Sequence, residues 1–286
     1  ISTDPRSMLH SRLSLAILLL ALAPSPFALA QTRELSSSGE LLDGIAALVM
    51  MASAAAAHAE VTGSLAATTD YNWRGVSQTA QSPALQGSLD FATDMGFHGG
   101  AWASNVDFGG GDPNIEIDLY AGYGGGETFL WDVGILYYTY TGASDFNFTE
   151  FYGSLGWEWI TGKVSYSYNF GGYAGAQAFY YEANVDYPLP ADFSLLGHFG
   201  YSDGDGIETA YGQDNYFDWS AGVGYTWKHF DFSLKYTDGE DLETLRDTSR
   251  DISSSDAVVI FTVSTSFPWS NDEPVSGEME AKEAAQ

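Results

Sequence analysis

From residue 60 to residue 267, apolar and polar side chains alternate in short segments that are separated by Gly, Asp, Asn and Pro. A period of two is typical of β-strands, and no helical period competes with it. In the segment 115–123, for example, Ile, Leu and Tyr side chains occupy one face, and the other face carries Glu and Asp. The pattern predicts twelve strands, at 61–71, 83–93, 97–107, 115–123, 128–140, 149–159, 163–170, 178–187, 193–201, 217–227, 230–238 and 257–267.

The connections between these strands alternate in length along the chain. Short turns are predicted at 94–96, 124–127, 160–162, 188–192 and 228–229, and longer loops at 72–82, 108–114, 141–148, 171–177, 202–216 and 239–256. Alternating short turns and long loops, an even number of strands and strand lengths near ten residues are typical of outer-membrane barrels. We therefore expect an all-β fold, a transmembrane antiparallel up-and-down β-barrel of about twelve strands over residues 60–267.

Large aromatic side chains fall on the apolar faces of the predicted strands, several of them near strand ends. Trp131, Trp157 and Trp227 are examples. Aromatic girdles of membrane barrels occupy such positions at the two membrane interfaces. In the alternative, a water-soluble sandwich, the same rings would fill the space between two sheets.

The residues before the first strand contain two segments that resemble secretory signals. Residues 8–30 have a charged start, an apolar centre and an Ala-x-Ala-like end, and residues 45–59 repeat the apolar run and the small-residue end. The initial Ile1 is compatible with one of them being upstream sequence translated from a misassigned start. Both apolar runs are shorter than the 18 or more residues that a spanning helix needs. We predict a processed region at 1–59 and, after the barrel, an acidic tail at 268–286.

Composition narrows the functional classes. The 286 residues include 38 acidic and 10 basic side chains, a formal net charge of −28, which argues against an electrostatically driven nucleic-acid binder. The chain has no cysteine, which excludes disulfides and thiolate metal sites. Aromatic residues make up 15% and hydrophobic residues 45% of the chain, more than is typical of disordered proteins.

Several motifs resemble the TorF family, bacterial outer-membrane proteins regarded as porins. The resemblance is carried by the run 70–79 (DYNWRGVSQT) with 83–87 (PALQG), and by 102–108 (WASNVDF), 116–123 (EIDLYAGY) and 137–140 (YYTY). It covers about residues 60–267. The resemblance implies an outer-membrane barrel with a pore, and it brings no known substrate.

Strand parity predicts which side chains line the lumen. It directs nine carboxylates inward, namely Glu116, Asp118, Asp132, Glu150, Glu158, Glu182, Asp186, Asp218 and Asp231, against one basic wall residue, Lys235. Rings of carboxylates in a narrow passage favour cations; the alternative is that they only keep the lumen hydrated. Arg74, where the first strand meets its loop, is a further candidate: it could form part of a constriction, bind an anionic solute, or pair with a luminal carboxylate.

We find no sequence signature of an enzyme, a metal centre or a cofactor. The five histidines are scattered, and no Gly-x-Ser-x-Gly, His-Glu-x-x-His or phosphate loop is present. Acidic runs at 203–208 and 238–243 could hold calcium or magnesium between neighbouring loops or lipopolysaccharide phosphates, but they lack EF-hand spacing, so solvated loops are expected there. A luminal His198 is expected to be a packed or hydrogen-bonded wall residue.

The sequence thus predicts an outer-membrane porin that conducts small solutes, with a preference for cations. Its expected partners are outer-membrane lipids, lipopolysaccharide and the solutes themselves, and homo-oligomers are compatible with this interpretation. The competing hypothesis is a structural or adhesive barrel whose lumen is plugged, since inward-facing tyrosines could close a lumen of this size. These are Tyr120, Tyr138, Tyr152 and Tyr180.

Overall fold

The computed structural model describes residues 59–109, 113–239, 242 and 253–269. The predicted signal-like region, apart from its last residue, and the predicted tail beyond residue 269 lie outside the described residues, and both remain predictions. Among the described residues, no helix is long and apolar enough to span a membrane.

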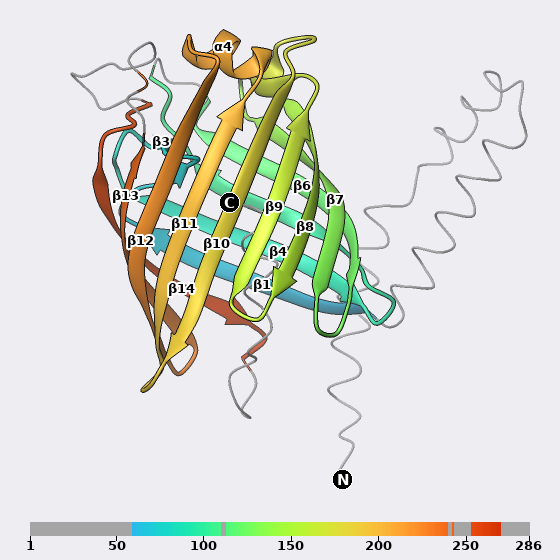
Figure 1. The fold of residues 1–286 in the computed structure, drawn as a ribbon, viewed down its shortest axis with the longest axis vertical. Helices are drawn as coiled ribbons and strands as arrows, with labels where there is room; N and C mark the ends of the chain where they lie inside the picture. Colours follow the sequence, from blue (N-terminus) through green and yellow to red (C-terminus); the bar gives the residue numbers. More distant parts are fainter. Residues whose placement is uncertain (1–58, 110–112, 240–241, 243–252, 270–286) are drawn as a thin grey trace, which may run out of the picture. The chain divides into compact units, whose positions relative to one another are not determined.

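The described strands form a closed antiparallel barrel (Figure 1). Its twelve members are β1 (Ala59–Thr68), β4 (Ala84–Thr93), β5 (Phe97–Asn105), β6 (Ile115–Gly125), β7 (Leu130–Tyr140), β8 (Phe148–Trp157), β9 (Ile160–Ser167), β10 (Ala178–Leu189), β11 (Phe193–Asp203), β12 (Asn215–Trp227), β13 (Phe230–Gly239) and β14 (Val258–Phe267). Each strand pairs with its neighbour along the chain, and β1 closes the barrel by pairing with β14, from Gly63 opposite Phe267 to Thr68 opposite Thr262. The predicted twelve-stranded barrel is confirmed.

The described residues contain five further short elements, which, apart from Phe170, occur in segments that the sequence pattern assigns to loops. They are β2 (Asn72–Trp73), β3 (Val76–Ser77), the 3-10 turns η2 (Ser144–Phe146) and η3 (Phe170–Gly172), and the helix α4 (Asp205–Tyr211). Figure 1 shows α4 at the end of the barrel where the long loops lie. We call this end the loop end and the opposite end the turn end.

The outer face of the barrel is apolar, which excludes the soluble sandwich. In β6, Leu119 is 50% exposed, whereas its neighbour Asp118 on the other face is fully buried. The same outward exposure of large apolar side chains recurs around the barrel, including Val133, Val223 and Phe261. A continuous apolar exterior around a closed sheet is stable in a lipid bilayer and unfavourable in water. The protein is therefore an outer-membrane β-barrel, and its outward face contacts membrane lipids.

Candidate functional site inside the barrel

The loop that follows β1 folds into the barrel interior as a small hairpin. β2 and β3 pair through Asn72 opposite Ser77 and Trp73 opposite Val76. The two residues of the turn, Arg74 and Gly75, both have positive φ angles, 50° and 78°. Positive φ at both central positions is the conformation of a type I′ hairpin turn, in which Asn and Gly are favoured. Arginine at the first of these positions is unusual, and the contacts of its side chain are described below.

Glycine is required at the tip of this turn. A Cβ atom added to Gly75 would lie 2.7 Å from the Cβ of Asp218 on β12, closer than two carbon atoms can pack. The positive φ of Gly75 adds backbone strain to any other residue. The hairpin tip therefore lies directly against the inner side of β12.

We expect Gly75→Ala to lower the free energy of unfolding by about 1–3 kcal/mol, because the added methyl group clashes and the backbone is strained. Urea titration of the barrel in lipid vesicles measures this effect. Gly175→Ala is the matched control, since Gly175 also has a positive φ but no atom lies within 4 Å of the position that a Cβ would occupy there. If both variants lost the same stability, the close contact with Asp218 would contribute nothing.

A buried carboxylate holds the base of the hairpin. Asp70 accepts hydrogen bonds from the hydroxyls of Ser77, at 2.6 Å, and Thr79, at 3.0 Å. Burial raises the pKa of the Asp70 carboxyl, and the two hydroxyl donors act in the opposite direction. These contacts join the start of the hairpin to its end, so β2 and β3 are positioned as one unit.

Trp73 anchors the hairpin in an aromatic cluster at the loop end. Its ring stacks on Phe170 with centroids 6.0 Å apart and lies edge-on to Tyr138 at 5.8 Å and Phe148 at 6.3 Å. Only 8% of Trp73 is exposed. Aromatic pairs of this kind add about 0.5–1.5 kcal/mol each beyond the burial of area. The cluster fills the lumen beneath η3.

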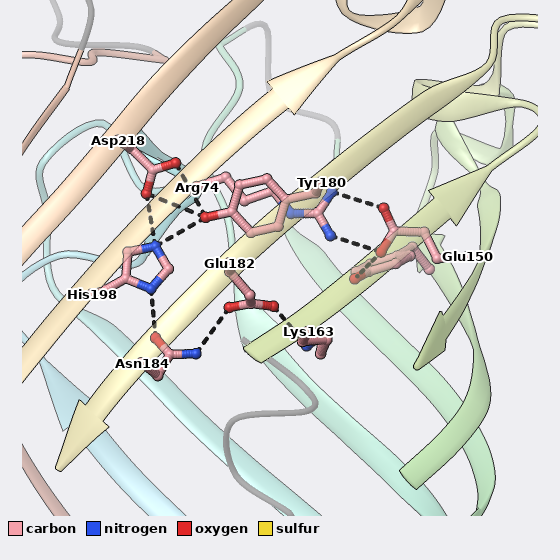
Figure 2. Close-up of polar contacts among 9 residues, drawn as sticks. Arg74, Glu150, Lys163, Tyr180, Glu182, Asn184, His198 and Asp218 are labelled. Carbon is pink, nitrogen blue, oxygen red and sulfur yellow. Dashed lines mark hydrogen bonds and ion pairs between the residues drawn. The ribbon is translucent and has the colours of Figure 1, made fainter. Parts of the chain in front are cut away.

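Arg74 reaches across the lumen to the wall (Figure 2). Its two terminal nitrogens donate to the two carboxylate oxygens of Glu150 on β8, both at 2.8 Å. The guanidinium carbon lies 4.2 Å from the ring centroid of Trp73 and 4.2 Å from that of Tyr180 on β10. Tyr138 also donates to Glu150, at 3.2 Å. The guanidinium is thus held by a two-pronged ion pair and two ring faces, an arrangement that suits its flat shape.

A chain of hydrogen bonds continues along the wall from the hairpin tip (Figure 2). Asp218 contacts both Tyr180 and His198, with the His198 Nε2 atom 3.0 Å from its carboxylate. The chain then runs from His198 through Asn184 to Glu182 and ends at Lys163, whose Nζ atom is 3.1 Å from Glu182. The prediction of a hydrogen-bonded His198 is correct.

Two further carboxylates at the loop end are buried and have no basic partner among the described residues. Glu116 accepts long hydrogen bonds from Tyr71, at 3.5 Å, and Tyr140, at 3.3 Å, through one oxygen only. Both oxygens of Asp118 are buried and have no hydrogen-bond partner within the described part of the chain. Together with Glu150 and Asp218, these side chains are at most 3% exposed. The lumen is therefore filled at this level.

The turn end of the interior is more accessible. His98 contacts Asp132 at 2.6 Å, and the two side chains are 28% and 24% exposed. Tyr120 donates to Asp90 on the neighbouring wall, and Lys235 on β13 is half-buried. The interior thus has a closed layer near the loops and a half-exposed layer near the turns.

The predicted luminal residues separate into three groups. Six lie in the closed layer, and Asp132, Asp186 and Lys235 are half-buried nearer the turn end. Glu158 does not face the lumen, contrary to the prediction, because it is exposed in the turn between β8 and β9, where its φ is 52°. Asp231, near the turn end of β13, is also exposed. The six in the closed layer are Arg74, Glu116, Asp118, Glu150, Glu182 and Asp218.

Sequence reasoning overlooked Lys163 as an inward basic residue. It alternates with the outward Val164 on β9, so strand parity could have identified it. The role of Trp73 and Gly75 could not be found in this way, because parity applies only to strands of the wall. Among the roles considered for Arg74, the structure contains the pairing with a luminal carboxylate, Glu150.

Comparison with known proteins places the chain in a bacterial family. Residues 52–267 match the model of a family described as "Bacterial protein of unknown function (Gcw_chp)", and the chain belongs to this family. The name TorF is not confirmed by this match. A search of curated proteins finds no match.

Among solved structures, the chain is similar in fold to several outer-membrane porins. The NanC porin has a TM-score of 0.49 at 10% identity, with 72% of this chain and 99% of that chain covered. The KdgM porin has a TM-score of 0.47 at 9% identity, covering 73% and 99%. OprD from Pseudomonas aeruginosa has a TM-score of 0.32 at 8% identity, covering 72% and 64%. These likenesses concern the fold alone.

Proposed function

We propose that the protein is a non-enzymatic outer-membrane channel for small solutes that favours cations, and that the β2–β3 hairpin closes it in the state described above. The long loops then face the exterior among lipopolysaccharide, and the short turns face the periplasm. Conduction would take place within each copy, because every barrel closes on itself, whether or not copies associate.

The proposal rests mainly on which part of the molecule carries each charged side chain of the closed layer. Its carboxylates belong to the wall strands, whereas Arg74 belongs to the hairpin. When the hairpin withdraws, the wall at this level keeps five carboxylates against the single lysine Lys163 among the described residues. A passage lined in this way attracts cations and repels anions. The five are Glu116, Asp118, Glu150, Glu182 and Asp218.

A closed structural barrel is the second candidate, and a specific observation favours it. Side chains of the closed layer such as Asp118 and Asp218 are at most 2% exposed, so this state leaves no room for a hydrated ion at their level. The two candidates differ in whether the hairpin ever leaves the lumen.

Current through a planar bilayer distinguishes the two candidates. For the full-length protein purified in detergent, we expect brief openings with a cation-selective reversal potential under a tenfold KCl gradient. Replacing Glu116 by Gln and Asp118 by Asn should move the reversal potential toward zero, because two uncompensated carboxylates are removed from the passage. Asp231→Asn, at an exposed position near the turns, is the matched control and should leave it unchanged. A folded, heat-modifiable protein that passes no current, even with its hairpin anchors removed, would establish the structural barrel instead.

A further inference from the structure

The contacts of Arg74 describe a binding slot as well as an ion pair. One side of the slot is built into the wall: Glu150 presents both oxygens to one planar cation, Tyr138 orients the carboxylate, and Tyr180 offers a ring face. All three wall side chains are at most 4% exposed. Their positions are set by the ladders of β7, β8 and β10, so they remain when the hairpin moves.

The guanidinium that fills the slot belongs to the β2–β3 hairpin and not to the wall. Arg74 is located in the turn of the hairpin, outside the sheet of the barrel, and it takes a left-handed conformation that Asn or Gly would adopt at lower cost. A simple plug would need only a bulky apolar tip. Here the tip carries the one group whose flat, two-pronged geometry fits Glu150 and the two rings.

We infer that the slot formed by Glu150, Tyr138 and Tyr180 recognises small solutes that carry a guanidinium group, and that Arg74 occupies it as an internal substitute for such a solute. Competition between the solute and Arg74 for Glu150 then couples the arrival of the solute to release of the hairpin. The coupling to release of the hairpin rests on the proposed channel function. Binding of guanidinium to the slot can be measured whether or not the protein conducts.

The chemistry of the slot favours guanidinium over other cations. An ammonium group or a potassium ion cannot donate two parallel hydrogen bonds to one carboxylate while it lies flat between aromatic rings. Once the hairpin leaves and water reaches the lumen, the neighbouring carboxylates Glu116 and Asp118 can ionise, and their negative charge then raises the local concentration of any cation. Charge therefore attracts cations in general, and the shape of the slot selects among them.

Removal of the internal occupant should expose the slot to a soluble probe. In the full-length protein with Arg74→Asn, which retains a residue suited to the turn, we expect methylguanidinium to bind at least tenfold more tightly than to the wild type, measured by ligand-observed NMR in detergent micelles. Adding Glu150→Gln to this variant should weaken binding at least tenfold. Glu158→Gln, at an exposed turn, is the matched control and should have no effect. Methylammonium should bind at least tenfold more weakly than methylguanidinium.

Each outcome of this experiment bears on the inference. Equal binding of methylguanidinium to the wild type and to Arg74→Asn, or binding that survives Glu150→Gln, would overturn the inference.

If Arg74→Asn fails to fold, Arg74→Lys is the second variant. Lysine keeps the charge but loses the second hydrogen bond, so methylguanidinium should displace the lysine at a severalfold lower concentration than it displaces arginine. If methylguanidinium binds but the protein never conducts, the proposed channel is refuted and the guanidinium slot is supported. If the protein conducts cations but does not bind methylguanidinium, the slot is refuted and the channel is supported.

Discussion

Replacing Trp73 by Ala and Arg74 by Asn in one variant should raise the mean current through the protein at least tenfold. Trp73 is anchored among aromatic rings and Arg74 on Glu150, and these are the principal side-chain anchors of the described hairpin in the wall. Loss of a buried tryptophan side chain alone costs about 3–5 kcal/mol. Because about 1.4 kcal/mol changes an equilibrium tenfold, the closed state should lose most of its advantage.

Single-channel recording under symmetric KCl measures this change. The matched control is Trp227→Ala, because Trp227 is 50% exposed on the outer face near the turn end. That variant should conduct like the wild type. An unchanged current in the double variant, with the barrel still folded, would mean that the hairpin does not close the lumen.

The second large effect concerns stability. Glu150→Ala leaves the Arg74 guanidinium buried without its carboxylate, and removing one partner of a buried ion pair typically costs about 3–5 kcal/mol. We expect a loss of that size in the free energy of unfolding, measured by urea titration in lipid vesicles.

The double variant Glu150→Ala with Arg74→Asn provides the control. It removes the stranded cation, so it should recover part of the stability that Glu150→Ala loses. If the losses of the two single variants simply added, the two side chains would not be coupled, and the ion pair would contribute little to closing the lumen.

The wall of the barrel could be predicted from the sequence because its signals are local. Each strand repeats apolar and polar positions with a period of two, and each ends at turn-forming residues, so all twelve wall strands were predicted near their observed positions. Errors occur at the ends, where the pattern carries less information. The predicted strand 149–159 includes Glu158, which the structure places in the turn after β8.

The interior could be predicted only in part, for a physical reason. Parity assigns a side chain to a face of the sheet, and it placed Glu150 and Asp218 on the inner one, where the structure has them. It does not say where a loop goes. Whether residues 72–82 extend into solvent or fold inward depends on contacts with Glu150, Phe170 and Asp218, which are about 70 to 150 residues away along the chain.

The pairing of β1 with β14 constrains the order in which the protein can assemble. Gly63 lies opposite Phe267, so the final seam forms only after the strand farthest along the sequence is available. Until then, β1 and β13 each have one edge of unpaired backbone groups, which are costly in lipid and prone to pair with other chains. Closure of a seam between such distant segments is a slow, late event. Assembly of this barrel is therefore expected to depend on a factor that shields both edges until β14 arrives.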